Sequence, residues 1–231
     1  MNAGIVGRVH GEFSDIDTDP FPLTRSENGE QLRSTVSVET VREHLGGDQI
    51  LTGFAAEQVQ SEAPSSTIDP DGNLIETGNE IQTHTDSTEF ICDPGEFVLV
   101  ENSKKEYAFD LIGRVTESAI ERVNFDLDSF LDFHPDAQIW MGGFYNHSGS
   151  ATTGVAYGDV LDDPNIGPIM EDSNKNQVGV VIENESEKIK MQITESGYVS
   201  VFQPSEFGPL SMARLIREEL LEHAKPREEV N

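Results

Sequence analysis

The chain has 231 residues, of which 43 are Asp or Glu and 15 are Lys or Arg, so its formal net charge is -28 at pH 7. This length allows one large domain or two small ones, each with a real core. The single cysteine, Cys92, excludes an intramolecular disulfide framework and a zinc cluster built on several cysteines. No segment approaches the roughly 20 apolar residues of a membrane-spanning helix, and we therefore expect a cytoplasmic protein.

The N-terminal part, residues 1–60, is expected to hold a strand and a helix. Gly and Val mix in Ala3–His10 in a way that favours a strand, and a turn rich in Asp follows it. Ser37 is a candidate N-cap for the helix, and the Gly46–Gly47 pair is a candidate stop. The apolar positions that define the helical face are Val38, Val41 and Leu45.

Residues 61–95 are predicted to form an acidic loop or linker. The segment is polar, and prolines and glycines interrupt every long periodic pattern within it. Isolated strands inside it, for example around residues 72–75, are compatible with this pattern. We expect the segment to separate the N-terminal part from a sheet domain over residues 96–231.

The first elements of that sheet domain are predicted to be strands. Phe97–Val100 and Tyr107–Val115 are apolar runs joined by a polar turn, which indicates a β-hairpin. Apolar and polar residues alternate over residues 122–127, which is the period of a strand with one buried face. Asp128 is a candidate cap for a short helical turn. Gln138–Tyr145 is predicted to be a core strand with a bulge at its two glycines.

The C-terminal segment predicts three successive strands and a helix. Apolar residues dominate or alternate in Val178–Ile182, Ile189–Ile193 and Tyr198–Phe202, with polar turns between them, which is typical of a β-meander. A helix that begins near Pro209 and ends before Pro226 closes the chain. The expected fold class is therefore α+β, with an antiparallel-rich sheet and a C-terminal β-meander closed by the final helix, plus a smaller N-terminal part.

The densest group of candidate metal ligands is Asp132, His134 and Asp136. If this region is extended, the three side chains share one face and offer oxygen and imidazole ligands to a divalent cation. The alternative is an acidic surface in contact with water, because about one residue in five of the chain is acidic and carboxylates cluster by chance.

The best candidate for a ligand-binding loop follows Tyr145. Small residues there leave backbone amides accessible, and hydroxyl groups could bind an anion. An imidazole, a phenol and a carboxylate nearby could supply a base, a nucleophile and an orienting acid. The alternative is a flexible turn between strands. The candidate residues are His147, Ser148, Ser150, Thr152, Tyr157 and Asp159.

Nucleic-acid binding depends on Lys and Arg, which form no stripe in this chain. Lys188 and Lys190 would lie on the same face of a strand and make a small basic patch. The alternative is the ordinary alternation of a strand with one face in solvent.

The charge excess is spread along the chain, and in dilute salt so many like charges repel each other across a compact body. This composition resembles that of proteins from salt-in archaea, in which surface carboxylates dominate and Lys is scarce. The resemblance implies a high-salt cytoplasm, in such a cell or in a cell infected by one of its viruses.

Standard catalytic patterns such as Gly-x-Ser-x-Gly and His-Glu-x-x-His are missing from the sequence. Our leading hypothesis is therefore a non-catalytic binding, regulatory or assembly protein whose partner is another protein or a second copy of the chain. One alternative is a metal-assisted hydrolase or nucleotide-processing enzyme that uses the candidate metal and loop residues. The other is a nucleic-acid-associated factor. Apart from that divalent cation, we expect no cofactor.

Overall fold

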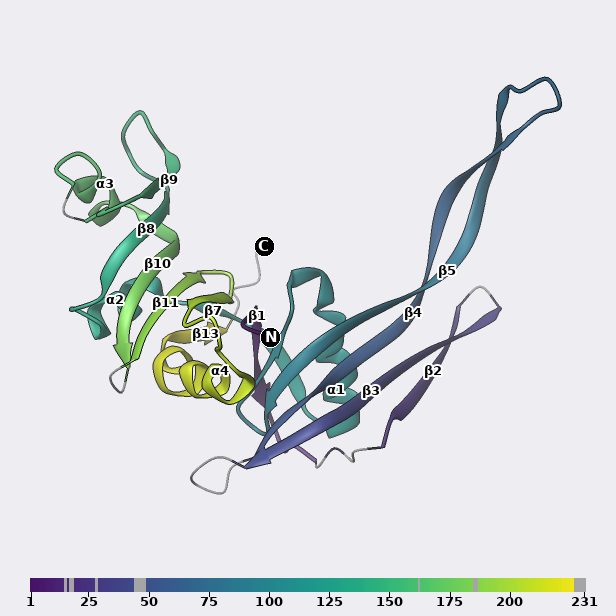
Figure 1. The fold of residues 1–231 in the computed structure, drawn as a ribbon, viewed down its shortest axis with the longest axis horizontal. Helices are drawn as coiled ribbons and strands as arrows, with labels where there is room; N and C mark the ends of the chain where they lie inside the picture. The colour runs from purple at the N-terminus through teal and green to yellow at the C-terminus, as the bar shows by residue number, and fades with distance from the viewer. Residues whose placement is uncertain are drawn as a thin grey trace.

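The computed structural model describes residues 1–14, 16, 19–27, 29–43, 49–161, 163–184 and 187–226. Most of these residues belong to one large antiparallel sheet with few helices (Figure 1). Its strands follow the order β2-β3-β4-β5-β6-β1-β12-β11-β10-β8-β9, while β7 pairs with β1 and with β13. This agrees with an α+β fold at the level of a sheet-rich chain. Within the described residues, no helix is long and apolar enough to cross a membrane.

The first six strands build one half of the sheet. They are β1 (Ala3–His10), β2 (Phe21–Glu27), β3 (Glu30–Glu43), β4 (Gln49–Ile68), β5 (Leu74–Asp93) and β6 (Phe97–Val100). The predicted strand at Ala3–His10 is confirmed as β1. The predicted helix after Ser37 is wrong, because this region is strand β3, in which Val36 and Val38 are buried and Val38 pairs with Gly53 of β4. Leu45 and the Gly46–Gly47 pair lie outside the described residues.

The predicted loop or linker over residues 61–95 is also corrected by the structure. Most of it consists of the outer part of β4 and all of β5, and these two strands pair from Leu51↔Cys92 to Ile68↔Leu74. Pro64 remains in the ribbon opposite Asn79, and the register shifts just beyond it, next to Gly78. Proline and glycine are compatible with a strand at an edge or a bulge, which is why they do not end this one.

The remaining elements form the other half of the sheet and its helices. They are η1 (Ser103–Lys105), α1 (Tyr107–Thr116), β7 (Ala119–Phe125), α2 (Leu127–Phe133), β8 (Gln138–Tyr145), β9 (Thr153–Tyr157), α3 (Gly167–Glu171), β10 (Asn174–Asn184), β11 (Glu187–Thr194), β12 (Tyr198–Gln203), α4 (Pro209–Leu215), the π-helical η2 (Ile216–Leu220), η3 (Leu221–His223) and β13 (Ala224–Pro226). β10, β11 and β12 pair as antiparallel neighbours. Gln138–Tyr145 is confirmed as strand β8.

Three local predictions in this half need correction. Tyr107–Val115 is not a strand, because its buried residues recur every three or four positions and form helix α1. The N-cap of α2 is Asp126, whose side chain accepts a hydrogen bond from Ser129 N at 3.0 Å, and Asp128 lies in the first turn. The bulge predicted at Gly142 and Gly143 of β8 is displaced. The pairing of β8 with β10 skips Asn176 of β10 and Trp140 of β8, so the irregularities lie on either side of these glycines.

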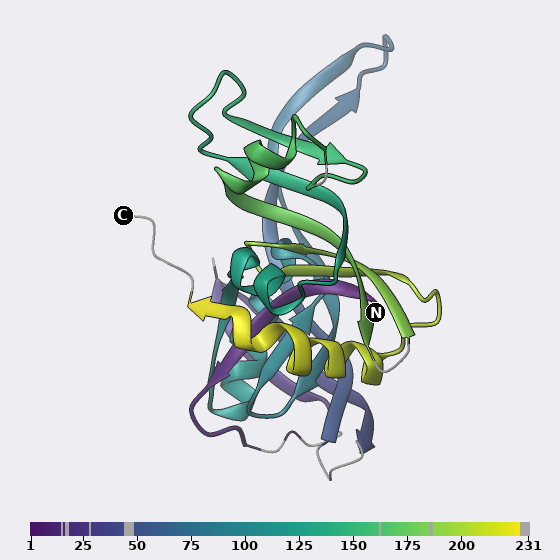
Figure 2. The same ribbon diagram turned by 90° about the vertical axis from the view of Figure 1, so that its left-hand side faces the viewer.

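Two hydrophobic clusters hold the helices on the sheet. One cluster joins Met212 of α4 and Ile216 of η2 with buried residues of β10, β11 and β12. The C-terminal helical segment, formed by α4, η2 and η3, runs alongside the sheet in Figure 2. In the other cluster, Phe109 and Ile112 of α1 pack with residues of β3 to β6. Cys92 belongs to this second cluster, and burial raises the pKa of its thiol well above the usual value.

Candidate protein-binding arm

The outer parts of β4 and β5 form a two-stranded ribbon that projects from the body of the molecule (Figure 1). β3 pairs with β4 only as far as Glu57, and β6 pairs with β5 only from Phe90 to Asp93. In the part of the chain that the structure describes, no third strand pairs with residues 61–82. We call residues 61–82 the arm.

The tip of the arm is a turn organised by one carboxylate. Asp69 Oδ1 accepts hydrogen bonds from Asp71 N at 3.0 Å and Asn73 N at 2.8 Å, and Asp69 Oδ2 accepts one from Asn73 Nδ2 at 3.1 Å. These bonds lower the pKa of Asp69. Gly72 has φ +86°, a left-handed conformation that a glycine adopts without strain. The tip is therefore a preorganised turn.

Large apolar side chains are exposed on the arm. Ile68 and Leu74 face each other across the ribbon next to the turn, and 70% and 72% of their surfaces are exposed. Ile75 and Ile81 are exposed to 45% and 55%. An isolated hairpin is marginally stable in water, and exposed apolar groups of this size commonly mark a binding surface.

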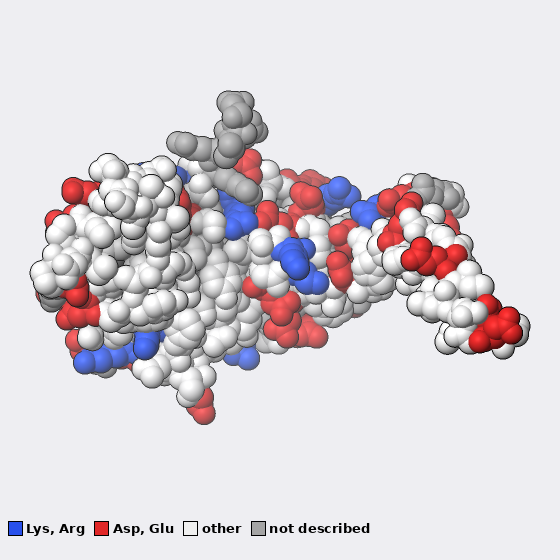
Figure 3. All heavy atoms as spheres, turned by 90° about the horizontal axis from the view of Figure 1, so that it is seen from above, with Lys and Arg blue, Asp and Glu red and all other residues white. Residues whose placement is uncertain are grey.

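The arm is acidic throughout. It contains Glu62, Asp69, Asp71, Glu76 and Glu80 and no Lys or Arg. Figure 3 shows acidic side chains at the end of the arm and no basic ones there. A surface of this sign repels phosphate groups and attracts basic protein surfaces.

The hairpin of β2 and β3 supports the base of the arm. Arg25 Nη1 lies 3.3 Å from Glu57 Oε2, and Arg25 Nη2 donates a hydrogen bond to the Gln58 carbonyl at 3.2 Å. Gln60 Nε2 donates one to Glu30 Oε2 at 2.9 Å. Further out, Asn79 Nδ2 donates to Glu62 Oε2 across the ribbon at 3.2 Å. The arm thus leaves the body in a defined direction.

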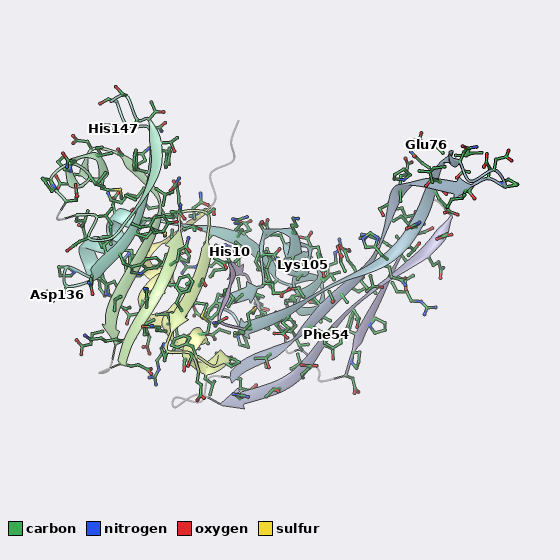
Figure 4. The ribbon with its side chains drawn as sticks, turned by 45° about the horizontal axis from the view of Figure 1, so that its top comes forward. His10, Phe54, Glu76, Lys105, Asp136 and His147 are labelled. Carbon is green, nitrogen blue, oxygen red and sulfur yellow. The ribbon has the colours of Figure 1, made fainter. Side chains whose placement is uncertain are left out.

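The residues of the predicted ligand loop lie at the opposite end of the molecule from the arm, as the positions of His147 and Glu76 in Figure 4 show. His147, Ser148, Ser150 and Thr152 connect β8 to β9, Tyr157 ends β9, and Asp159 follows it. The His147 ring packs edge-on against Phe144 with centroids 6.3 Å apart. Among the described residues, no hydrogen bond joins His147 to Tyr157 or Asp159.

The structure does not bring Asp132, His134 and Asp136 to a common extended face. Asp132 lies in α2 and His134 follows the last turn of this helix, so helical geometry replaces the alternation that the prediction assumed. His134 Nε2 instead lies 3.2 Å from Glu219 Oε2. Within the described residues, no group of three His, Cys, Asp or Glu side chains is placed to hold a metal ion.

No pattern in the sequence indicates the environment that His134 has in the structure. His223 lies beside it, and both imidazoles contact the rings of Phe130 and Phe133. Ser129 Oγ lies 2.8 Å from His223 Nδ1. Burial lowers the pKa of both imidazoles, while burial and the charges of Glu218 and Glu222 raise the pKa of Glu219. These residues are far apart in the chain, and only the packing of α2 on η2 and η3 joins them.

This cluster predicts a loss of stability on mild acidification. In the unfolded chain both histidines are protonated near their usual pKa of 6.5, whereas in the folded chain their pKa values are lower. Protonation therefore favours the unfolded chain, and Tm should fall as the pH drops from 7 to 5.5. Glu219 acts in the opposite direction, because its raised pKa favours the folded state as the pH falls towards 4.5. In a His134→Gln/His223→Gln variant, the Tm should change much less over this range. An unchanged pH profile in the variant would contradict the prediction, and His84→Gln on exposed β5 is the control.

Lys188 and Lys190 lie on β11 and alternate with the buried residues Ile189 and Met191. Lys188 is opposite Glu183 on β10. Lys190 Nζ lies over the ring of Trp140, 4.6 Å from its centroid, which is a cation–π contact. Each lysine thus has a neighbour in the sheet that accounts for its position.

Comparison with known proteins finds no matching family model, curated protein or solved structure.

Proposed function

We propose that the chain is a non-catalytic binding or assembly protein that engages a partner protein through the arm. The observation that carries this proposal is the projecting two-stranded ribbon, whose exposed apolar residues are not covered by any other strand of the described part of the chain. Burying Ile68 and Leu74 in a partner would remove a large apolar surface from water, at about 25 cal/mol per Å². The preorganised turn at Asp69 lowers the entropic cost of binding, because the tip is already ordered.

The charge of the arm indicates the chemistry of the partner surface. The arm carries five carboxylates and no basic residue, so the complementary surface is an apolar pocket bordered by Lys or Arg. Nucleic acid is a poor partner for this arm, since its phosphates carry the same sign of charge.

We further propose that the protein works in a high-salt cytoplasm. The formal net charge of -28 supports this setting, because molar salt screens the repulsion between carboxylates that would otherwise oppose compaction and association. Apolar burial is not weakened by such screening, which makes an apolar tip a suitable contact in concentrated salt.

The arm proposal is tested by an Ile68→Ser/Leu74→Ser variant in an affinity pull-down from a native high-salt lysate. The variant should fold normally, since both side chains are exposed. We expect it to recover a stoichiometric partner at least tenfold less efficiently than the unmodified chain does. The matched control is Leu161→Ser, which removes an exposed apolar side chain (41%) far along the chain from the arm. Equal recovery by the arm variant would show that the arm is not the binding surface.

A further inference from the structure

The two edges of the sheet differ in how they are protected from pairing with another chain. β2, at one edge, contains Pro22, Arg25 and Glu27, which are typical protecting residues. β9, at the other edge, has the sequence Thr-Gly-Val-Ala-Tyr, with no proline and no charge. Among the described residues it pairs only with β8. β9 is therefore an open edge without the usual safeguards.

The backbone of β9 has hydrogen-bonding groups that point away from the sheet. Gly158 N donates to the Trp140 carbonyl at 2.9 Å, and the alternation of an antiparallel pair then directs the amides of Gly154 and Ala156 towards β8. The N–H and C=O groups of Thr153, Val155 and Tyr157 point outward by the same alternation.

The side chains of these outward-bonding residues are exposed as well. Val155 is 45% exposed and Tyr157 is 74% exposed, and both lie on one face of the strand. The other face approaches the protein closely, because a Cβ atom on Gly154 would lie 2.9 Å from Phe144 Cζ. An added strand would thus find both a row of backbone partners and an apolar face.

The chain segment that follows β9 is acidic. Residues 135–174 contain no Lys or Arg, and Asp159, Asp163, Glu171 and Asp172 lie in the segment that follows β9. We propose that β9 accepts an extended segment of a partner protein in which aliphatic and basic residues alternate, and that this segment extends the sheet by one strand. Main-chain hydrogen bonds would supply affinity, and the carboxylates would select a basic segment.

This edge is independent of the arm, which lies at the other end of the molecule (Figure 4). An Ile68→Ser/Leu74→Ser variant should therefore bind a β9 ligand as the unmodified chain does. A negative result for the arm therefore does not contradict the proposal for β9, and a negative result for β9 does not contradict the proposal for the arm.

The probe for the experiment is a nine-residue peptide of alternating Val and Lys, titrated into the full chain at the lowest KCl concentration at which the chain stays folded, so that its charges are least screened, and followed by amide chemical shifts in NMR spectra. We expect the largest shifts in β9. Val155→Pro removes one outward N–H and keeps the bonds to β8, and it should weaken binding at least tenfold. Val155→Thr keeps the N–H and should bind within about twofold of the unmodified chain.

Two further measurements serve as controls for folding and for charge. Val155→Lys leaves the backbone unchanged and adds a charge that repels the peptide, so it should also weaken binding even if Val155→Pro folds poorly. A peptide of alternating Val and Glu should bind at least tenfold more weakly than the Val-Lys peptide. The proposal is overturned if the Val-Lys peptide does not bind at millimolar concentration, if its shifts map elsewhere, or if the Val155→Lys variant binds it as well as Val155→Thr does.

Discussion

The melting temperature of the protein should rise by roughly 10–20 °C between dilute buffer and molar KCl. The formal net charge of -28 is distributed over the arm and the body, and salt shortens the range of the repulsion from about 10 Å at 0.1 M to about 3 Å at 1 M. If screening raises the free energy of unfolding by roughly 5 kcal/mol, this shift follows, since 1 kcal/mol moves Tm by about 2–4 °C in a domain of this size. Circular dichroism melts at increasing KCl concentration measure it.

A charge-neutralised variant separates screening from a general salt effect on apolar burial. Glu62→Gln/Glu76→Gln/Glu80→Gln removes three carboxylates from the exposed arm without touching the core, so Tm should depend less steeply on KCl concentration in this variant. Equal melting temperatures in dilute buffer and in concentrated KCl would show that the salt-adaptation hypothesis is wrong.

The sequence predicts strands well where the hydrophobic pattern is long and unambiguous. Ala3–His10 and Gln138–Tyr145 are examples. It fails for α1, because Tyr107–Val115 is a short apolar run whose buried face has helical spacing and whose length also suits a strand. It fails for β3, because Val38, Val41 and Leu45 mimic a helical face while pairing with β4 decides the local structure.

The arm could not be predicted from hydrophobicity, because residues 74–85 of β5 are exposed and have no buried face to impose a period of two. Its length comes from cross-strand pairing alone, as in Glu62↔Ile81. The environment of His134 was also hidden, since its neighbours Glu219 and His223 are more than eighty residues away in the sequence. Sequence patterns name candidate side chains, but contacts between distant elements determine which of them meet.

Arg217→Met should destabilise the fold by about 3–5 kcal/mol, because it leaves a buried carboxylate without its main partner. Asp93, at the end of β5, is 2% exposed, and Arg217 of η2 reaches it through Nε at 2.6 Å and Nη2 at 2.5 Å. The expected fall in Tm is roughly 6–20 °C. Asp93 is the last residue of β5, so the pair fastens the inner end of this strand, away from the arm, to the C-terminal helical segment.

The matched control is Arg214→Met, one turn earlier. Arg214 Nε lies 3.9 Å from Glu218 Oε1 at the surface, a pair that contributes at most about 1 kcal/mol. Adding Asp93→Asn to Arg217→Met should recover part of the lost stability, since it removes the buried charge and keeps the shape of the side chain. Thermal melts of the three variants in the same KCl concentration decide the question. If Arg217→Met and Arg214→Met melt at the same temperature, the ion pair with Asp93 does not hold the inner end of β5 to the helical segment.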